Sequence, residues 1–445
     1  MTKTIANWGN YPRIQTEEFS YTSAETLRTQ LLGDHLPGIS RGNGRSYGDA
    51  SLAQRTYSSL SFDHVLAFDS VNGVFECESG LMLDSVLEIV VPKGWFLPVS
   101  PGTKYITVGG AVASDIHGKN HHLEGSFCNH LMAFDIMLAS GEIVTCTQTQ
   151  NIDLFEATQG GMGLTGIILT IKFKLKKIQT SFIRQTQIKA TNLTELFDLF
   201  FEHKSNTYSM AWIDCLKSGK NFGRSILMVG EHATIDQLSR KQRENSLQPR
   251  SDTLFSLPAN LPPFVLNEYS VKAFNYLFYK KNVKKTINNI VPYDPFFYPL
   301  DKILKWNRMY GRKGFLQYQF VLPMSESKRG MTEILTRINK KSKASFLAVF
   351  KVFGKQNKLI SFTMEGCTLA LDFPLHDALF PFLDELDQIV LDYGGRLYLT
   401  KDARMTPDTF WASYPGASRF YQIVKRYNPN NKFRSLQSDR LSITS

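Results

Sequence analysis

Cysteine is scarce in this sequence, and its distribution excludes two common structural roles. The 445 residues include only five cysteines, with no Cys-x-x-Cys pair: Cys77, Cys128, Cys146, Cys215 and Cys367. An odd, widely spaced set argues against a disulfide framework and against a zinc site, and it favours a reducing compartment. We therefore expect free thiols and no bound metal ion.

Long apolar runs are absent as well. No uninterrupted stretch of about 18 apolar residues occurs, so no membrane-spanning helix is expected. Residues 1–9 lack the apolar core of a secretory signal peptide. These absences predict a soluble or peripheral protein that works on the cytoplasmic side, at the inner face of the cell membrane.

The basic residues form no block, although the net charge is +11. The densest basic run, Lys172–Lys177, alternates lysine with Phe173 and Leu175, a pattern typical of an edge strand with one charged face. No nucleic-acid-binding signature is present, so we expect no nucleic-acid partner. A phosphorylated substrate and an anionic membrane surface each account for the charge.

Glycine-rich stretches are what the sequence does contain. Arg41–Asp49 interleaves three glycines with arginine, asparagine and serine, and turns of this kind align backbone N–H groups into an anion-binding nest. The stretch is neither a P-loop nor a Rossmann fingerprint. A second stretch, Gly109–Phe127, combines small residues, which let backbone approach a ligand closely, with three histidines and a lysine. Taken alone, this stretch fits a ligand site or a solvated loop.

The remaining pattern mixes helices and strands. Periodicity predicts helices at 22–32, 82–91, 193–203, 332–341 and 375–393, and a hairpin of strands 131–138 and 143–147. Further strands are expected at 167–173, 210–215, 225–229, 315–321 and 368–373. Thr22 and Glu25 fit a capping box at the first helix. The polar, then proline-rich segment 241–263 is predicted to be a long mobile loop.

Several motifs together carry a family resemblance. Gly42–Asp49, Val108–Ala111, Asp115–Asn120 and Gly163–Gly166 occur in the order typical of vanillyl-alcohol-oxidase-type FAD enzymes. Within that superfamily the sequence most closely resembles the decaprenylphosphoryl-β-D-ribose oxidases, the flavin half of a ribose-to-arabinose 2′-epimerase. The motifs specific to that resemblance are Asp115–His122, Trp306–Gly311, Gly314–Val321, Phe350–Gly354, Leu371–Pro374 and Gly395–Asp402.

The resemblance implies an α+β fold. It would contain a two-lobed FAD-binding domain of the PCMH type and a substrate domain made of an antiparallel sheet with helices. We predict the FAD-binding domain at residues 1–177 and the substrate-binding domain at 178–394. A C-terminal segment at 395–445 would return to the FAD domain.

FAD is the cofactor that the resemblance implies, with its pyrophosphate in the nest at 41–49. In related alditol oxidases the histidine that matches His117 carries a covalent flavin bond. In the lipid-sugar oxidases it does not, so we expect non-covalent FAD. The residues assigned to the cofactor by the resemblance are Trp8, Arg41, Gly42, Asn43, Gly44, Arg45, Ser46, Tyr47, Gly48, Asp49, Pro101, Gly102, Thr103, Thr107, Val108, Gly109, Gly110, Ser114, Asp115, Ile116, His117, Gly118, Lys119, Asn120, Ile167 and Tyr398.

Lys401 and His117 are the expected catalytic residues. Oxidation of a secondary alcohol needs a hydride acceptor, here flavin N5, and a group that receives the hydroxyl proton. The resemblance places Lys401 beside the sugar, where burial would lower its proton affinity and make it a base or a polarising donor. For Lys119 and His121, contact with phosphate or reduced flavin and simple solvation are alternatives.

The expected substrate residues lie mainly on two strands. Gln317 and Gln319 are two apart, so on a strand they share a face, which would present amides to sugar hydroxyls or to solvent. Lys351 and Phe353 likewise share a face, suited to a phosphate contact and an apolar wall. The resemblance completes the substrate set with Asp372 and Arg308.

The reaction implied is FAD-dependent oxidation of the C2′ hydroxyl of a polyprenylphosphoryl-β-D-ribose to the 2′-keto sugar. It is the first half of epimerisation to an arabinose precursor of the cell wall. A separate NAD(P)H-dependent keto-reductase would complete it, and the loop at 241–263 would admit the prenyl tail with partial membrane contact. The alternative is oxidation of a soluble sugar, alditol or aldonolactone. Gly118-Lys119-Asn120, in place of the Gly-Ser-Gly common in those enzymes, disfavours that alternative.

One position departs from the family pattern. Mycobacterial members carry a cysteine two residues before the Asp-Phe-Pro motif, and covalent inhibitors trap it; here that position is Ala370. Cys367 lies three residues earlier, on the opposite face of a strand. We therefore expect no reaction with thiol-trapping inhibitors, and intact oxidation chemistry, because hydride transfer needs no thiol.

Overall fold

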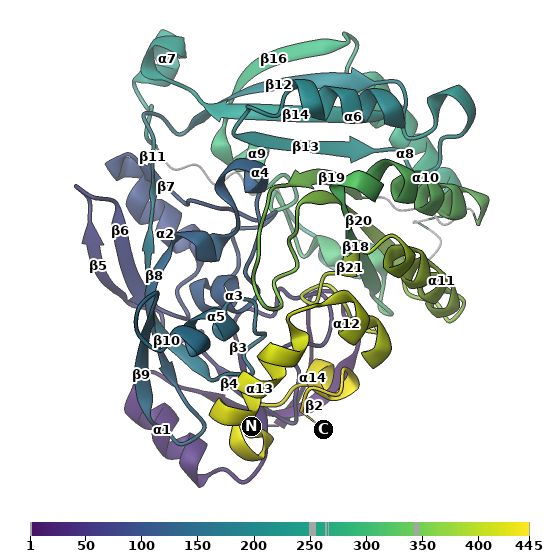
Figure 1. Ribbon diagram of the computed structural model, residues 1–445. Helices are drawn as coiled ribbons and strands as arrows, with labels where there is room; N and C mark the ends of the chain where they lie inside the picture. Colours follow the sequence, from purple (N-terminus) through teal and green to yellow (C-terminus); the bar gives the residue numbers. More distant parts are fainter. Residues whose placement is uncertain (1, 249–254, 263–264, 266, 342–346, 445) are drawn as a thin grey trace.

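The computed structural model has an α+β fold in which three sheets carry most of the strands and helices pack against them (Figure 1). It describes residues 2–248, 255–262, 265, 267–341 and 347–444. The loop predicted at 241–263 falls partly outside the described residues. Its described part holds the end of helix α7 (Arg240–Arg243) and strand β15 (Phe255–Ser256).

The chain begins with a four-stranded sheet of order β1-β2-β4-β3. Its strands are β1 (Thr2–Ala6), β2 (Arg13–Ser20), β3 (Gly38–Arg41) and β4 (Arg55–Ser58). Helix α1 (Ala24–Gly33) follows β2. The capping box predicted at Thr22 and Glu25 is wrong by one position. Ser23 has the extended backbone of an N-cap, and its Oγ accepts a 3.2 Å hydrogen bond from the Thr26 N–H.

A five-stranded antiparallel sheet of order β5-β6-β10-β8-β9 comes next. It consists of β5 (Val65–Asp69), β6 (Val74–Glu78), β8 (Leu131–Met137), β9 (Ile143–Thr147) and β10 (Ile167–Lys174), and the predicted β8–β9 hairpin is confirmed. The prediction of an edge strand around Lys172 is wrong, because β10 lies between β6 and β8. Glu76 on β6 pairs with the Lys172 ammonium at 3.2 Å, while Phe173 is fully buried. Helices α2 (Leu83–Val90), α3 (Val108–Ala113) and α5 (Ile152–Thr158) share this sheet's core.

An eight-stranded antiparallel sheet forms the upper part of Figure 1, in the order β16-β12-β14-β13-β19-β20-β18-β21. Its strands are β12 (Phe182–Ala190), β13 (Tyr208–Ile213), β14 (Ser225–His232), β16 (Thr286–Pro292), β18 (Phe315–Pro323), β19 (Ala348–Phe353), β20 (Gly366–Pro374) and β21 (Arg396–Leu397). Helices α6 (Leu193–Glu202), α10 (Met324–Lys340) and α11 (Leu379–Asp392) contribute to its apolar core. Along β18, Leu316, Tyr318 and Phe320 belong to that core, so the alternate residues face the other side.

Several further elements lie outside these three sheets. They are α4 (His121–Glu124), α8 (Glu268–Lys281), α9 (Tyr293–Phe297), the pair β7 (Trp95–Phe96) with β11 (Lys176–Lys177), and β17 (Ile303–Leu304), which pairs with β15. A buried ion pair between Lys104 and Asp294 fixes α9 to the N-terminal half. The large sheet draws its strands from residues 182–397, and the domain boundaries stay a prediction.

The C-terminal helices lie beside the N-terminal sheet in the lower part of Figure 1. They are α12 (Pro407–Ser413), α13 (Ala417–Tyr427) and α14 (Leu436–Arg440). Arg440 donates hydrogen bonds of 2.8 and 3.0 Å to the carboxylate of Asp49, and the Gly38 N–H bonds the Lys432 carbonyl at 2.9 Å. The last residues therefore stabilise the first glycine-rich stretch.

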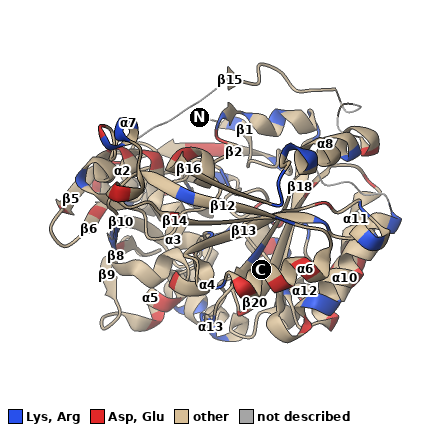
Figure 2. Cartoon of the chain, turned by 90° about the horizontal axis from the view of Figure 1, so that it is seen from above, with Lys and Arg blue, Asp and Glu red and all other residues tan. Residues whose placement is uncertain are grey.

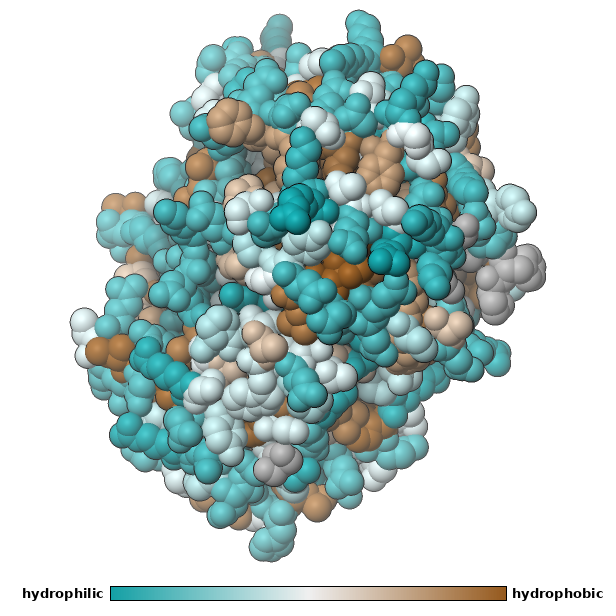
Figure 3. All heavy atoms as spheres, turned by 45° about the vertical axis from the view of Figure 1, so that its right-hand side comes forward, coloured by the Kyte–Doolittle hydropathy of each residue, from teal (hydrophilic) through white to brown (hydrophobic). Residues whose placement is uncertain are grey.

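The surface is polar with scattered apolar patches. Figure 2 shows lysine and arginine spread over many elements, with acidic residues among them. The face drawn in Figure 3 is mainly hydrophilic, and apolar side chains gather near its centre. In the part of the chain that the structure describes, no helix combines the length and the apolar character needed to cross a bilayer.

Candidate active site

A cavity of about 310 Å³ lies between the two glycine-rich stretches and the eight-stranded sheet. The inner face of that sheet, which carries Gln317, Gln319 and Lys351, lines the cavity. The volume of the cavity is at the lower end of the range for small-molecule sites. The predicted site residues that line it are Trp8, Gly42, Asn43, Gly44, Arg45, Ser46, Tyr47, Pro101, Gly102, Thr103, Thr107, Gly109, Gly110, Ser114, Ile116, His117, Lys119, Gln317, Gln319, Lys351, Tyr398 and Lys401. The fold thus gathers one site from residues 8 to 401.

The first glycine-rich stretch forms one wall of the cavity. Gly44 has a φ of +59°, a conformation that favours glycine. A Cβ added at Gly42 would lie 2.3 Å from the Thr107 Oγ1, so the two stretches meet there without room for a side chain. The Arg45 guanidinium lies 3.9 Å from the centroid of the Trp8 ring. A wall with bare backbone and a half-buried cation suits an anionic phosphate group.

The second stretch forms the adjoining wall at helix α3. Thr107 caps this helix, because its Oγ1 accepts a 3.2 Å hydrogen bond from the Gly110 N–H. A Cβ at Gly109 would lie 2.8 Å from the Cβ of Ser79, so the backbone here is packed as closely as glycine permits. These walls fit the predicted FAD, which needs close backbone approach around its pyrophosphate.

Lys401 reaches the cavity from the turn that follows β21. Its Nζ lies 3.5 Å from the centroid of the Tyr47 ring, and the Tyr47 N–H donates to the Thr400 carbonyl at 2.9 Å. Burial lowers the pKa of Lys401 to about 7; Asp372 opposes this shift and the positive charge of Lys351 adds to it. A lysine that is partly neutral at pH 7 can accept a proton.

His117 is held neutral inside an aromatic cage. The ring centroids of Phe353, Phe362 and Tyr398 lie 4.8, 5.6 and 5.1 Å from that of His117. The amide nitrogen of Gln319 lies 3.2 Å from the His117 Nε2. Burial lowers the pKa of His117 well below its usual value, and neighbouring cationic groups add to the effect. The imidazole can therefore exchange hydrogen bonds but carries no charge at neutral pH.

The inner face of the large sheet supplies amides and a second lysine. Gln317 and Gln319 both point into the cavity, which confirms that they share a face and excludes the solvent-facing alternative. The amide of Gln317 donates to the carboxylate of Asp372 at 2.6 Å, and burial raises the pKa of Asp372 to about 7. Lys351 on β19 lines the same cavity, and burial lowers its pKa to about 8.

Lys119 and His121 are both buried, so the solvated alternative is wrong for each. The Lys119 ammonium donates to the Phe297 carbonyl at 3.1 Å, and burial lowers its pKa to about 7. Lys119 also lines the cavity, whereas His121 does not. The His121 Nε2 lies 3.1 Å from the Gln356 side-chain oxygen, and its Nδ1 accepts from the Gly354 N–H at 3.2 Å. His121 thus fastens the segment after β19.

Several predicted site residues lie outside the lining of the cavity. In the cofactor set these are Arg41, Gly48, Asp49, Val108, Asp115, Gly118, Asn120 and Ile167, and in the substrate set they are Phe353, Asp372 and Arg308. Arg41 donates to the Ala6 carbonyl at 2.9 Å, and Arg308 donates to the carbonyls of Leu257 and Pro258 at 2.7 and 2.6 Å. Such side chains hold the neighbouring segments in place.

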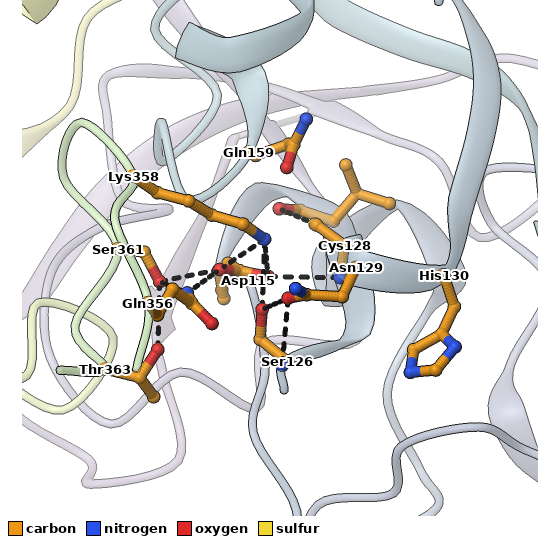
Figure 4. A network of polar contacts seen from close by, with 12 residues as sticks. Asp115, Ser126, Cys128, Asn129, His130, Gln159, Gln356, Lys358, Ser361 and Thr363 are labelled. Carbon is orange, nitrogen blue, oxygen red and sulfur yellow. Dashed lines mark hydrogen bonds and ion pairs between the residues drawn. The ribbon is translucent and has the colours of Figure 1, made fainter. Parts of the chain in front are cut away.

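Asp115 is the centre of a buried polar network (Figure 4). Its carboxylate accepts hydrogen bonds from Ser361 at 2.6 Å and from Gln356 at 2.9 Å, and it pairs with the Lys358 ammonium at 3.1 Å. Burial alone would raise the pKa of Asp115, but Lys358 and these hydrogen bonds outweigh it and lower the pKa. Asp115 has a φ of +38° and stands two residues before His117. The network therefore fastens the β19–β20 connection to the backbone that carries His117.

Sequence reasoning missed part of the lining. The further lining residues are Ser40, Ala50, Ser51, Ser59, Ser79, Ser100, Ile106, Ala113, Met162, Gly163, Gly166, Ile168, Met210, Phe297, Pro299, Leu300, Trp306, Leu347, Val349, Ala370 and Thr400. Four of them, Gly163, Gly166, Trp306 and Thr400, fall within the family motifs. The period-two pattern of β19 links Val349 to Lys351. No sequence pattern marked the serines, because only the tertiary fold brings these separated positions to the same cavity.

Comparison with known proteins defines the class. Residues 31–147 match the family model described as the FAD binding domain. That range contains both glycine-rich walls of the cavity, and a buried lysine of lowered pKa faces them. The fold and the site thus define an FAD-dependent oxidoreductase.

Individual relatives narrow the class to a family. The chain is 34% identical to decaprenylphosphoryl-β-D-ribose oxidase of Mycolicibacterium smegmatis, over 99% of the chain and 98% of that protein. It is 30% identical to an uncharacterized protein of Streptomyces coelicolor, over 82% of the chain and 100% of that protein. The likeness to the human Δ(24)-sterol reductase, 28% identity, covers 25% of the chain and 22% of that protein. The chain belongs to the decaprenylphosphoryl-β-D-ribose oxidase family.

Proposed function

We propose that the protein oxidises the C2′ hydroxyl of a polyprenylphosphoryl-β-D-ribose to the 2′-keto sugar. The observation that carries this proposal is the meeting of Lys401, the pair Gln317 and Gln319, and Lys351 in one cavity beside the FAD-binding walls. Alcohol oxidation needs a proton acceptor, sugar hydroxyls need hydrogen-bond partners, and a phosphate needs a cation. The printed name of the Mycolicibacterium smegmatis relative agrees with this chemistry.

These four polar residues then each have a task in the proposed reaction. FAD, when bound, supplies the hydride acceptor. Neutral Lys401 accepts the hydroxyl proton, and the nearby carboxylate of Asp372 favours the resulting ammonium. Gln317 and Gln319 orient the sugar through their amides. Lys351 binds the phosphate, whose charge favours the protonated lysine.

Neutral His117 completes the proposed catalytic pair. Because its aromatic cage and the neighbouring lysines oppose protonation, it acts as a hydrogen-bond partner for the flavin or the sugar. We propose that FAD is bound without a covalent link to His117. Denaturation followed by filtration should release all of the flavin into the filtrate, and flavin retained on the polypeptide would contradict this part of the proposal.

Two partners are part of the proposed function. The keto sugar still needs a hydride to become the arabinose derivative, so we propose a separate NAD(P)H-dependent keto-reductase as the next enzyme. A polyprenyl tail stays in the bilayer while its head group is oxidised, so we also propose peripheral contact with the membrane. The net charge of +11 supports attraction to an anionic lipid surface.

Anaerobic mixing with a short-chain polyprenylphosphoryl-β-D-ribose tests the proposal, with the visible absorption of the flavin as readout. Fast bleaching is expected with this compound, and none with free ribose, alditols or aldonolactones. Bleaching by a soluble polyol but not by the lipid-linked sugar would overturn the substrate and favour the soluble-sugar alternative. Purified keto-reductase added to the product should consume NAD(P)H only after the first step.

A further inference from the structure

Helix α8 carries a basic and apolar face that the fold leaves uncovered. Its inner side is packed: Val271 is buried, and Asn275 donates to the Asp214 carboxylate at 2.8 Å. On the outer side, by contrast, Tyr269, Tyr276 and Leu277 are 81%, 52% and 66% exposed. Tyr276 and Leu277 follow Tyr269 by seven and eight residues, which is about two helical turns, so the three side chains lie on one stripe of the helix.

Lysines surround this stripe. Residues 268–285 contain five lysines and one glutamate, a net charge of +4. Lys280, Lys281 and Lys284 make no ion pair with any residue that the structure describes. Val283, directly after the helix, is 89% exposed. We define the α8 face as Tyr269, Tyr276, Leu277, Val283 and these three lysines.

We propose that the α8 face is the surface by which the protein docks on an anionic lipid bilayer. Tyrosine and leucine side chains insert at the boundary between head groups and acyl chains, while lysine stems lie along it with their ammonium groups at the lipid phosphates. A second copy of the chain is a poor occupant, because two lysine-rich faces would repel each other. Lipid phosphates supply the opposite charge that the face lacks.

This inference deepens the membrane contact of the proposed function, but its test does not depend on the substrate. Flotation with vesicles of phosphatidylcholine and phosphatidylglycerol should recover the holoprotein with the lipid, and vesicles of phosphatidylcholine alone should not. Leu277→Gln should weaken binding about tenfold or more through lost apolar burial. Lys280→Gln with Lys284→Gln should weaken it about 25-fold, since each lysine near an anionic surface contributes about fivefold.

Matched controls lie on the other side of the molecule. Strands β5 and β6 lie on the left of Figure 1 and helix α8 on the right, and Val71, 85% exposed, is in the turn between these two strands. Val71→Gln, and Lys93→Gln with Lys174→Gln on exposed lysines of the N-terminal half, should bind vesicles like the wild type. The α8 variants should keep the wild-type melting temperature and flavin bleaching by the short-chain sugar, because the altered side chains are exposed and outside the cavity.

Three outcomes would overturn the inference. These are absence of wild-type binding to the anionic vesicles, wild-type binding by the α8 variants, and a concentration-dependent dimer that Leu277→Gln abolishes, which would assign the face to a second copy. Failure of the short-chain sugar to bleach the flavin would overturn the substrate proposal and leave the vesicle result standing.

Discussion

At the scale of single residues, three lysines with lowered pKa values give the cavity its acid–base chemistry. Lys401, Lys351 and Lys119 all lose proton affinity chiefly because burial disfavours the ammonium form. They differ in their neighbours. The carboxylate of Asp372 raises the pKa of Lys401 and so favours its protonated product state. That distinction makes Lys401 the proposed base.

Replacing Lys401 tests this assignment. Lys401→Met should slow flavin reduction by the sugar about 10²- to 10⁴-fold, because the hydroxyl proton loses its acceptor. In the wild type the rate should rise with pH through about 7, as the neutral form of Lys401 increases. Rapid-mixing kinetics from pH 6 to 9 measures both effects. Lys401→Arg keeps the charge but cannot deprotonate, so a wild-type rate in that variant would rule out a base at this position.

A cysteine introduced at Ala370 should make the protein reactive toward thiol-trapping inhibitors. Ala370 lines the cavity, whereas Cys367 lies in the apolar core on the other face of β20, with its thiol pKa raised to about 12 by burial. All five native cysteines are buried. Thiol-trapping inhibitors should therefore leave the wild type unmodified, and Ala370→Cys should form one adduct, detected by mass spectrometry of the intact protein. A time-dependent adduct on the wild type would contradict the prediction.

At the scale of elements, the β19–β20 connection is held by one carboxylate. Lys358→Met should destabilise the protein by about 3 kcal/mol, because it leaves the fully buried Asp115 charge without its cation. Amide exchange should accelerate in residues 354–362, and the nuclear magnetic resonance signals of the His117 ring should shift as its aromatic cage loosens.

The matched control for this change is Lys355→Met. Lys355 is exposed on the same connection, so its replacement should leave stability and exchange unchanged. If Lys355→Met and Lys358→Met had equal effects, the network at Asp115 would not be what holds the connection. Lys358→Arg, which keeps the cation, should recover most of the lost stability.

At the scale of the whole molecule, the buried lysines couple stability to pH. In the unfolded chain their pKa is about 10.4, so between pH 7 and 8 the unfolded state binds more protons than the folded state. A folded pKa below the unfolded one makes stability rise with pH in this window. With Lys119 and Lys401 near 7 and Lys351 near 8, the gain from pH 7 to 8 is about 2 kcal/mol.

Urea denaturation of the protein without FAD at pH 7 and pH 8 measures this gain. Lys401→Met should reduce it by roughly 1 kcal/mol, because one of the three titrating groups is gone. Equal midpoints for the wild type at the two pH values would show that these lysines keep their charge when buried. An anionic ligand in the cavity should also flatten the dependence, since it favours the protonated lysines.

Local patterns in the sequence predicted helices α1, α2, α6 and α11, the C-terminal half of α10, the β8–β9 hairpin and the two glycine-rich walls. The start of α10, eight residues earlier than predicted, and the other helices were not predicted. The same patterns also placed Gln317 and Gln319 on one strand face. The predicted features depend on neighbouring residues alone: backbone freedom at glycine and side-chain alternation along a strand. The motif order of the family then brought Lys401 to the same site.

Only the tertiary structure decided the features that depend on distant neighbours. Asp115 and Lys358 are 243 residues apart, and no local pattern pairs them. Strand β10 pairs with β6 on one side and with β8 on the other, which is why the edge-strand prediction was wrong. Burial of Lys119 and His121, and the lowered pKa of Lys401, likewise arise from packing between remote segments. The sequence shows where a lysine stands, but the surrounding fold determines its pKa and therefore whether it is protonated at neutral pH.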